Sequence, residues 1–427
     1  MHPTGTPSLV FADKRGNITD FDALAMAGMS NGRFAVPRPE ELIPLPEGSE
    51  LFLLPDRLPV GTDPETGEPL LLEENPYEAG SSIQAVAAFM APAHTAIYNS
   101  AFQKKSENAA ALPLFAYTAV GWYDEQFWVT GFRSDNDIRQ DSIQFNTRVI
   151  EQNTKRKLAE HPKNRLIQHL GTCSLTYCCP AARNYFLGRW EAPLPTSPQC
   201  NAKCLGCISL QPSGCCPSPQ QRLSFVPSAH EIAELAIPHL ITAERPIVSF
   251  GQGCEGEPLL QADTIEQAIR RIRKETTHGT INLNSNASLP QKMEKLAAIG
   301  LDSLRVSLNS VQAQYYTPYY NPSNYCFQDV KNSIKAMKAA GRFASLNYFI
   351  IPGLTDSNAE FDTLCSLIDE LSPDLIQLRN LNMDPQLYLQ SIGFPADARS
   401  MGILTWYNQL KEHFPKLQFG YYNPSLF

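Results

Sequence analysis

Two hydrophobic patterns alternate along the chain from residue 228 onward. Short apolar runs rich in Val, Ile and Leu, bounded by Pro or Gly, are typical of buried strands. The segments between them repeat apolar residues at intervals of three and four, which is the period of an amphipathic helix. One such helical stripe consists of Ile265, Ala268, Ile269 and Ile272. This alternation predicts an α/β fold with a parallel sheet.

The alternation defines six strand–helix units. The predicted strands span residues 187–194, 246–251, 280–284, 304–308, 346–351 and 375–378. Ser228 and Ser357 each stand three residues before a glutamate, which is the capping pattern of a helix start. Gly300 and Gly341 are expected to end helices.

The first third of the chain follows a different pattern. Proline is dense at 37–69 and helical periodicity is weak, whereas residues 51–54, 114–120 and 126–132 have the composition of strands. We therefore expect four parts. They are a β-rich N-terminal domain (1–142), a helical connector with a cysteine-containing segment (143–184), the α/β domain (185–385) and a C-terminal extension (386–427).

Composition narrows the class of protein. The chain has 427 residues, 43% of them hydrophobic, which supports a buried core and two or three domains. A net charge of −8 does not indicate a nucleic-acid binder. No segment is long and apolar enough to span a membrane, and the N-terminus lacks the pattern of a signal peptide. We expect a soluble cytoplasmic protein, in which eleven cysteines favour metal or redox use over disulfides.

Three of the cysteines form the most informative motif. Cys200, Cys204 and Cys207 are spaced Cys-x3-Cys-x2-Cys, with no fourth cysteine at a fixed short distance. Zinc ribbons and ferredoxins usually close their metal shell with a fourth ligand. Three thiolates hold three irons of a 4Fe-4S cluster and leave the fourth iron open to a small molecule. The spacing suggests chemistry at this iron, and a zinc site completed by another cysteine is the alternative.

A second motif follows the predicted strand 246–251. It is Gly256-Glu257-Pro258, preceded by Glu255. A carboxylate suits an ammonium group, and a glycine lets backbone approach a ligand closely. Together the two motifs make residues 185–385 resemble the radical SAM (S-adenosylmethionine) enzymes. In that family the second motif binds the amino group of the SAM methionine, which assigns this role to Glu257, and Glu255 replaces the first of two usual glycines.

The resemblance implies a partial (β/α)6 barrel with its site at the carboxyl ends of the strands. It implies a 4Fe-4S cluster on the three cysteines, with SAM on the open iron. One electron from a flavodoxin or ferredoxin then cleaves SAM to methionine and a 5′-deoxyadenosyl radical, which takes hydrogen from a substrate. Peptides or proteins, nucleic acids and small molecules all remain candidate substrates. The alternatives are an iron–sulfur electron-transfer protein and a zinc-stabilised binding protein.

Further residues extend the implied SAM site. The family often has a polar residue near the ribose at the end of the third strand, here Asn284. It often uses a serine or arginine of the fourth strand for the SAM carboxylate, here Ser307 or Arg305, which share one face of the strand. Gly206 stands where the family often has a large apolar residue near the adenine, so adenine packing is expected from elsewhere.

The remaining thiols and histidines have weaker signals. Cys254 is a candidate thiol radical or hydrogen-atom donor. Five cysteines near the main motif are either ligands of a second cluster or metal, or small buried hydrophobes. They are Cys173, Cys178, Cys179, Cys215 and Cys216. The eight histidines show no ligand pair at helical spacing and are expected to be structural or exposed. Residues 379–384 and Tyr388 are expected over the barrel mouth, as substrate contacts or a solvated loop.

Overall fold

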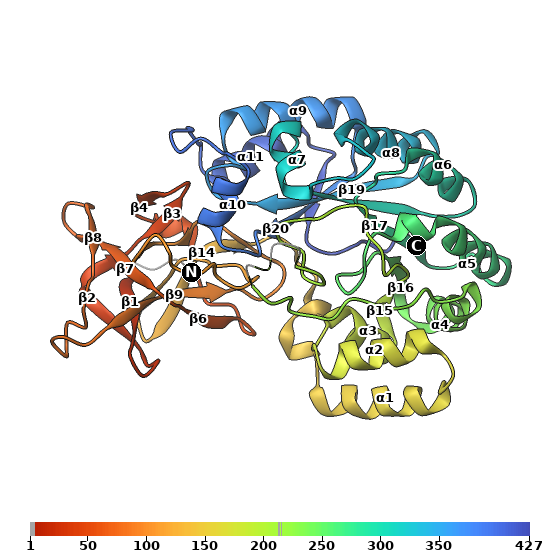
Figure 1. The fold of residues 1–427 in the computed structure, drawn as a ribbon, viewed down its shortest axis with the longest axis horizontal. Coiled ribbons are helices and arrows are strands. Elements are labelled where there is room, and N and C mark those ends of the chain that lie inside the picture. The colour runs from red at the N-terminus through yellow and green to blue at the C-terminus, as the bar shows by residue number, and fades with distance from the viewer. Residues whose placement is uncertain (1–4, 212–213, 215) are drawn as a thin grey trace.

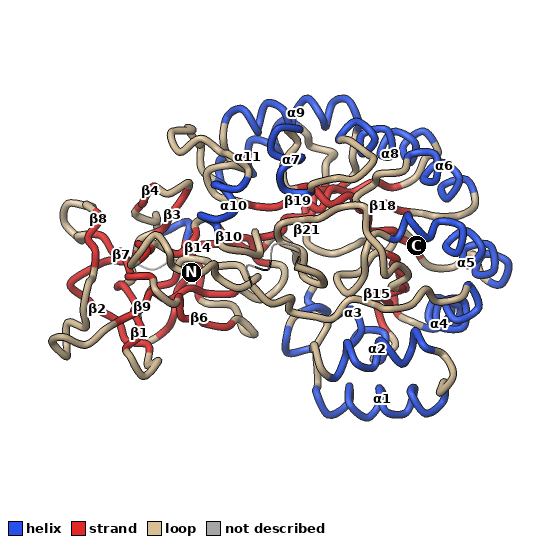
Figure 2. Tube along the Cα trace, in the orientation of Figure 1, coloured by secondary structure: helices blue, strands red, loops and turns tan. Residues whose placement is uncertain are grey.

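The computed structural model describes residues 5–211, 214 and 216–427. A β-rich region formed by the N-terminal third of the chain lies beside a parallel sheet whose outer side is covered by helices (Figure 1). The two parts differ plainly in secondary structure, because the first consists almost wholly of strands and loops (Figure 2). The α/β class and the β-rich N-terminal region are therefore confirmed.

The parallel sheet has seven strands, which follow one another in chain order. They are β15 (Arg189–Leu194), β16 (Glu244–Phe250), β17 (Thr280–Ser285), β18 (Ser303–Leu308), β19 (Phe343–Ile350), β20 (Leu375–Asn380) and β21 (Gln418–Gly420). Six of them are the predicted strands. The seventh is a correction, because β21 comes from the predicted C-terminal extension and pairs in parallel with β20. Its three residues are too few to show a strand pattern in the sequence.

Helices connect these strands on the outer side of the curled sheet (Figure 2). They are α4 (Ala229–Thr242), the 3-10 turn η4 (Pro258–Gln261), α5 (Ala262–Glu275), α6 (Pro290–Ala298), α7 (Ala313–Tyr320), α8 (Phe327–Ala339), α9 (Asn358–Leu371), α10 (Pro385–Ser391) and α11 (Ile403–His413). The predicted caps form, since the Ser228 and Ser357 hydroxyls accept the backbone N–H groups of Glu231 and Glu360.

The strands separate an apolar outer face from a polar inner face. In β18, Leu304, Val306 and Leu308 are fully buried in the core shared with the helices. Arg305 and Ser307 alternate with them and are only partly buried. Because successive residues of a strand point to opposite faces, Arg305 and Ser307 lie on the inner side of the half-barrel.

The N-terminal region is antiparallel. Its strands are β1 (Ser8–Asp13), β2 (Ile18–Met26), β3 (Gly28–Ser30), β4 (Arg33–Ala35), β5 (Leu42–Pro44), β6 (Glu50–Leu54), β7 (Arg57–Thr62), β8 (Pro69–Leu71), β9 (Ile83–Phe89), β10 (His94–Ala96), β11 (Asn99–Ser100), β12 (Phe102–Lys104), β13 (Val120–Tyr123) and β14 (Gln126–Arg133). Three short 3-10 turns are η1 (Pro39–Glu41), η2 (Ile138–Gln140) and η3 (Ser142–Gln144).

One predicted strand, 114–120, is wrong over most of its length. Only Val120 belongs to a strand, β13, and Thr118 makes isolated bridges to Ala88 and Asn99. At the start of this segment, the Phe115 N–H donates to the Pro113 carbonyl in a tight turn. The segment is apolar because it is buried, and burial without regular pairing leaves the same sequence signal.

A helical connector joins the two parts. It consists of α1 (Thr147–Glu160), α2 (Arg165–Leu175) and α3 (Pro180–Phe186). Asn146 and Asn164 cap α1 and α2 through their side-chain oxygens. Leu166, Ile167 and Leu170 of α2 are fully buried in the same core as the parallel sheet. The connector therefore packs on the barrel and is part of its core.

A buried ion pair fastens the N-terminal region to the barrel. Arg57 of β7 donates to Asp384 at 2.9 Å, and each side chain is only 1% exposed. Asn380, at the end of β20, accepts from the Ala96 N–H at 2.8 Å and donates to the His94 carbonyl at 3.0 Å. Two residues of the expected mouth segment 379–384 therefore serve the contact between the two parts and are not in a solvated loop.

The C-terminal tail crosses the inner side of the sheet. Asn423 donates to Glu191 of β15 at 2.8 Å and accepts from Gln377 of β20 at 2.9 Å. Farther on, the Leu426 N–H donates to Thr280 Oγ1 of β17 at 2.9 Å. Since β15 and β21 are the two unpaired edges of the sheet, the tail links strands that the backbone ladder leaves apart.

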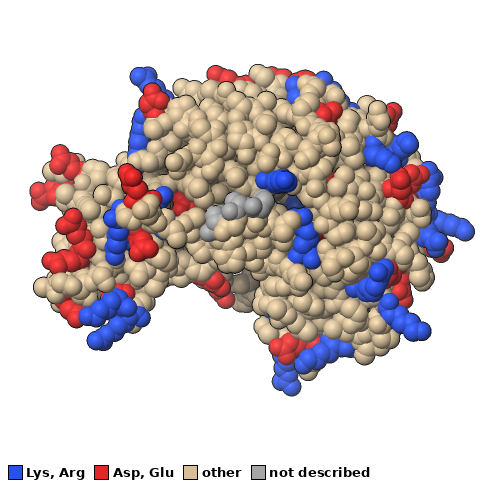
Figure 3. Space-filling model, in the orientation of Figure 1, with Lys and Arg blue, Asp and Glu red and all other residues tan. Residues whose placement is uncertain are grey.

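In the described part of the chain, no helix is both long and apolar enough to cross a membrane. Charged side chains on the face seen in Figure 3 lie mostly around its margin, with Lys and Arg interspersed among Asp and Glu.

Replacing Arg57 with Met is expected to lower the free energy of unfolding by about 3–5 kcal/mol, because it leaves the Asp384 carboxylate buried without its cation. Urea unfolding measures this. The control is Arg270→Met, which removes an exposed pair with Glu266 and should cost only about 0.3–0.5 kcal/mol. Equal effects of the two substitutions would show that the Arg57 pair does not hold the parts together.

Candidate functional site

The cysteine loop begins at the carboxyl end of β15. Cys200, Cys204 and Cys207 are each partly exposed. The loop is fixed from one side by the end of α7, where the Tyr319 and Tyr320 carbonyls accept the Leu205 and Lys203 N–H groups at 3.0 and 2.9 Å. The last carbonyls of a helix have no partner within it, so the loop satisfies groups that α7 leaves open.

The Gly-Glu-Pro segment lies directly against this loop. The Gly256 N–H donates to the Ser197 carbonyl at 2.7 Å, and the Glu257 N–H donates to the Gln199 carbonyl at 2.8 Å. A Cβ atom at residue 256 would meet the Gln199 oxygen at 2.0 Å. Only glycine permits this approach. The two sequence motifs, which are about fifty residues apart in the chain, are thus in backbone contact.

Glu255, the departure from the family pattern, has a clear structural task. Its carboxylate accepts the backbone N–H groups of Thr196, Ser197 and Gln252 at 2.7, 2.8 and 2.7 Å. It therefore ties the start of the cysteine loop to the loop after β16. Burial raises the pKa of Glu255 to about 8, although these three hydrogen bonds favour the charged form.

Glu257 is buried behind the same contact. Its carboxylate accepts from the Leu259 N–H at 2.9 Å, the Ser285 hydroxyl at 2.5 Å and the Asn286 N–H at 2.8 Å. A carboxylate offers about four lone-pair sites, and these three donors leave about one site free for a further donor. Burial raises the pKa of Glu257 to about 7. A ligand cation beside it would favour the charged form.

The thiols of the loop suit an iron–sulfur cluster. Burial raises the pKa of Cys200 to about 11 and also raises the pKa of Cys204, so both are neutral without a cation nearby. Iron binding supplies the positive charge that converts such thiols to thiolates. Arg222 donates to Cys207 Sγ at 3.3 Å. Three thiols at this spacing fit three irons of a cluster.

The inner face of the sheet carries polar atoms without partners. The Nε atoms of Arg305 and Arg379 and the Oδ1 atom of Asn347 are buried and make no hydrogen bond within the described part of the protein. Arg305 and Arg379 each donate instead to Gln377 Oε1, at 3.3 and 3.5 Å. Burial and the charge of Arg379 lower the pKa of Arg305 to about 10. Unpartnered groups of this kind favour a polar or anionic ligand in the half-barrel.

The other predicted SAM residues have different surroundings. Asn284 is buried and already engaged, since its amide donates to the Gly251 carbonyl and accepts from Asn282 at 2.8 Å each. Ser307 lies on the inner face with Arg305, and its register partner on β19 is Asn347. Pro258, the last residue of the Gly-Glu-Pro motif, is the first residue of η4. The space next to Gly206 is filled by Tyr319 and Met383, whose side-chain atoms lie 3.0 and 3.4 Å from where its Cβ would be.

The additional cysteines do not share one environment. Cys178 is exposed, Cys179 and Cys216 are partly exposed, and Cys215 lies outside the described residues. Cys173 and Cys254 are both buried and lie close together beside His169. His169 was expected to be structural or exposed, although its spacing of four residues from Cys173 on one helix is a signal that the sequence contains.

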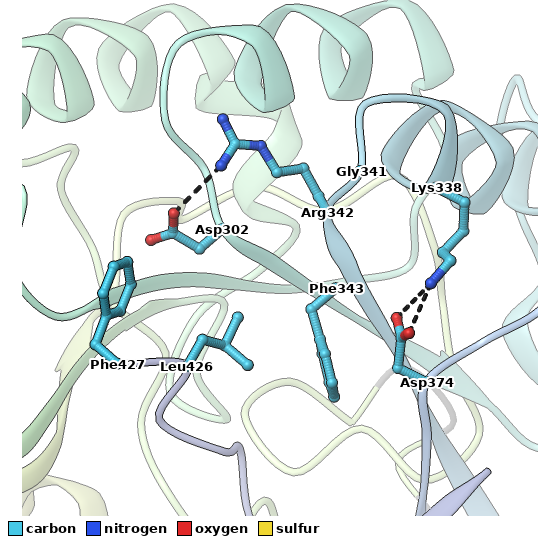
Figure 4. A pocket seen from close by; sticks show the side chains of 8 residues that line it. All are labelled: Asp302, Lys338, Gly341, Arg342, Phe343, Asp374, Leu426 and Phe427. Carbon is cyan, nitrogen blue, oxygen red and sulfur yellow. Dashed lines mark hydrogen bonds and ion pairs between the residues drawn. The ribbon is translucent and has the colours of Figure 1, made fainter. Parts of the chain in front are cut away.

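A cavity of about 410 Å³ lies elsewhere, at the amino ends of β18 and β19 (Figure 4). Its charged residues are paired, Lys338 with Asp374 at 2.7 Å and Arg342 with Asp302 at 3.5 Å. Parallel strands place their amino ends at the edge opposite the cysteine loop. This cavity is therefore not the candidate site.

Comparison with known proteins agrees with the geometry. The family model of the radical SAM superfamily matches residues 194–365, which include both motifs. This part of the chain is therefore similar to the radical SAM superfamily of enzymes. The chain is also similar to a GTP 3′,8-cyclase of Lactiplantibacillus plantarum, with 28% identity over 166 residues. That match covers 38% of this chain and 46% of the cyclase, so the chain spans about half the length of this curated relative.

Solved structures give more distant matches. Methylornithine synthase aligns with a TM-score of 0.39 and 14% identity, over 63% of this chain and 74% of that one. A radical SAM methyltransferase from Sphaerobacter thermophilus aligns with a TM-score of 0.35 and 16% identity, over 48% and 63%. These values are too low to support an argument about activity.

Replacing Gly256 with Ala is expected to displace the cysteine loop, because its Cβ would collide with backbone at Gln199. Overpacking of this kind costs about 1–3 kcal/mol. Iron content after anaerobic reconstitution should fall several-fold while the circular dichroism spectrum stays that of the native fold. The matched control is Gly253→Ala, whose Cβ would meet only the flexible ends of Gln220 and Ile208. Equal iron in both variants would contradict the close-contact argument.

Proposed function

We propose that this protein binds a 4Fe-4S cluster through Cys200, Cys204 and Cys207 and binds SAM beside it. The observation that carries the proposal is the pair of backbone hydrogen bonds from Gly256 and Glu257 to the cysteine loop. These bonds bring the cysteine loop and the Gly-Glu-Pro segment together, which supports a site that the two share. The residues present fit the cluster, because soft thiolates are preferred iron–sulfur ligands.

When bound, the reduced cluster supplies the electron that cleaves SAM to methionine and a radical that abstracts hydrogen from the substrate. The protein's residues position and shield the reacting groups. Glu257 accepts a hydrogen bond from the SAM ammonium at its remaining lone pair. Glu255 holds the cysteine loop and the loop after β16 together. Arg305 and Ser307 face the SAM carboxylate from the inner side of β18, and Tyr319 with Met383 borders the adenine near Gly206.

Asn284 has a more limited role in this proposal. Since its amide is bonded to Gly251 and Asn282, it shapes the ribose end of the site more than it binds the ligand. Gly256 lets the backbone approach, and Pro258 fixes the start of η4. The N-terminal region, held by Arg57, stands beside the mouth and contributes to the substrate side.

The proposed reaction needs a one-electron donor of low potential, such as a flavodoxin or ferredoxin. The cysteines are partly exposed, so the cluster is close enough to the surface for electron transfer. A cytoplasmic location is part of the same proposal. The test is anaerobic reconstitution followed by measurement of 5′-deoxyadenosine formed from SAM under reduction. An electron-transfer or zinc-stabilised protein would form none and would bind no SAM in calorimetry.

Single replacement of Cys200, Cys204 or Cys207 by Ala is expected to abolish 5′-deoxyadenosine formation and to lower iron content, because each thiolate holds a different iron. Cys365→Ala is the control, since Cys365 lies on helix α9 outside the site. Full iron content and full SAM cleavage in all three site variants would exclude this ligand set.

Glu257→Gln is expected to weaken SAM binding by roughly tenfold or more while cluster content changes little, because a charged acceptor contributes about 1.5–3 kcal/mol. Calorimetry on the reconstituted protein measures it. Glu360→Gln is the matched control: this carboxylate is also buried and accepts several hydrogen bonds, but it lies on α9. Unchanged SAM affinity in the Glu257 variant would remove the residue from the ligand site.

A further inference from the structure

Three potential metal ligands converge behind the Gly-Glu-Pro segment. His169 Nε2 lies 3.4 Å from Cys254 Sγ and 3.5 Å from Cys173 Sγ. All three ligand atoms lie within 4.8 Å of one another. Among the described residues, no other set of three His, Cys, Asp or Glu side chains converges this closely.

Secondary structure positions each of these side chains. His169 and Cys173 are four residues apart on α2 and therefore lie on one face of that helix. The helix is fixed by its Asn164 cap and by its packing in the core. Cys254 lies in the loop after β16, where its carbonyl accepts the Leu223 N–H at 2.7 Å. The cluster is therefore built from two separate elements that are each held in place.

The surroundings suit a closed site. Cys173 and Cys254 are 2% and 6% exposed, whereas His169 and Cys179 are partly exposed. The His169 ring is held by an edge contact with Phe225. Cys179 packs against the same cluster, and its N–H donates to the Cys173 carbonyl at 3.0 Å. Cys179 thus lies next to the three ligands, although its Sγ is not among the atoms that lie within 4.8 Å of one another.

We infer that His169, Cys173 and Cys254, with Cys179 as the fourth ligand, bind one Zn²⁺ ion. One imidazole and three thiolates form a preferred tetrahedral zinc set. Binding exchanges protons for metal: three thiols lose their protons, the imidazole binds as the neutral base, and no electron is transferred. The ion would tie α2 of the connector to the loop that carries Glu255 and Glu257. This site is separate from the cluster loop, whose three cysteines it does not use.

The test uses the full-length chain carrying Cys200→Ala, Cys204→Ala and Cys207→Ala, so that the cluster cysteines cannot bind metal. The reduced, metal-free protein is titrated anaerobically with Co²⁺, which reports tetrahedral thiolate coordination by its visible and charge-transfer bands, and then with Zn²⁺ in competition. We expect one equivalent of Co²⁺, displaced by one equivalent of Zn²⁺. Adding Cys173→Ser or Cys254→Ser should abolish the bands, whereas Cys365→Ser should leave them unchanged.

Two further variants keep the outcome decisive if a serine variant folds poorly. His169→Cys preserves a ligand and should bind one equivalent with a stronger charge-transfer band. Cys179→Ala should bind more weakly and with an altered visible spectrum. The inference is overturned if the starting protein binds no Co²⁺ or binds it without thiolate bands. It is also overturned if the bands are the same after Cys173→Ser, or if Cys173 and Cys254 are found as a disulfide that binds no metal after reduction.

Discussion

The close backbone contact between two loops is the constraint on which the candidate site depends. The Gly-Glu-Pro segment and the cysteine loop share hydrogen bonds at Ser197 and Gln199, and Gly256 leaves no room for a side chain between them. The buried Glu255 carboxylate reinforces the contact through three backbone N–H groups. Because buried carboxylates and backbone groups are costly to leave unpaired, the two loops have little freedom to separate. A cluster and its small-molecule ligand would therefore meet a site that is already assembled.

Supports from distant parts of the chain hold this site in place. The C-terminal carbonyls of α7 accept N–H groups of the cysteine loop, and Asn423 of the tail bridges β15 and β20 across the inner face. Arg57 reaches from the N-terminal region to Asp384 near the mouth of the half-barrel. Each of these contacts satisfies a polar group that would otherwise be buried without a partner. The two edge strands of the half-barrel do not pair with each other. These hydrogen bonds and this ion pair connect parts of the protein that the backbone hydrogen bonds of the sheet leave apart.

The inner and outer faces of the half-barrel differ in polarity. Its outer face is apolar and packs against helices, whereas its inner face carries Arg305, Asn347 and Arg379 with unpartnered atoms among the described residues. Polar groups of this kind are stabilised when a ligand supplies the missing partners. The Zn²⁺ site inferred at His169, Cys173 and Cys254 would help to hold the loop after β16 in place. Cys254 immediately precedes Glu255, whose carboxylate connects this loop to the cysteine loop.

The sequence by itself determined the local features: six of the seven parallel strands, the caps at Ser228 and Ser357, and the two motifs with their order. These follow from hydrophobic period, capping residues and spacing, which are all properties of neighbouring residues. Tertiary structure alone decided that β21 completes the sheet and that 114–120 is buried without forming a strand. It also decided that Asp384 pairs with Arg57 and that Cys254 meets His169. Such contacts join residues far apart in the chain, so no local pattern records them, and only the packed fold brings their side chains within bonding distance.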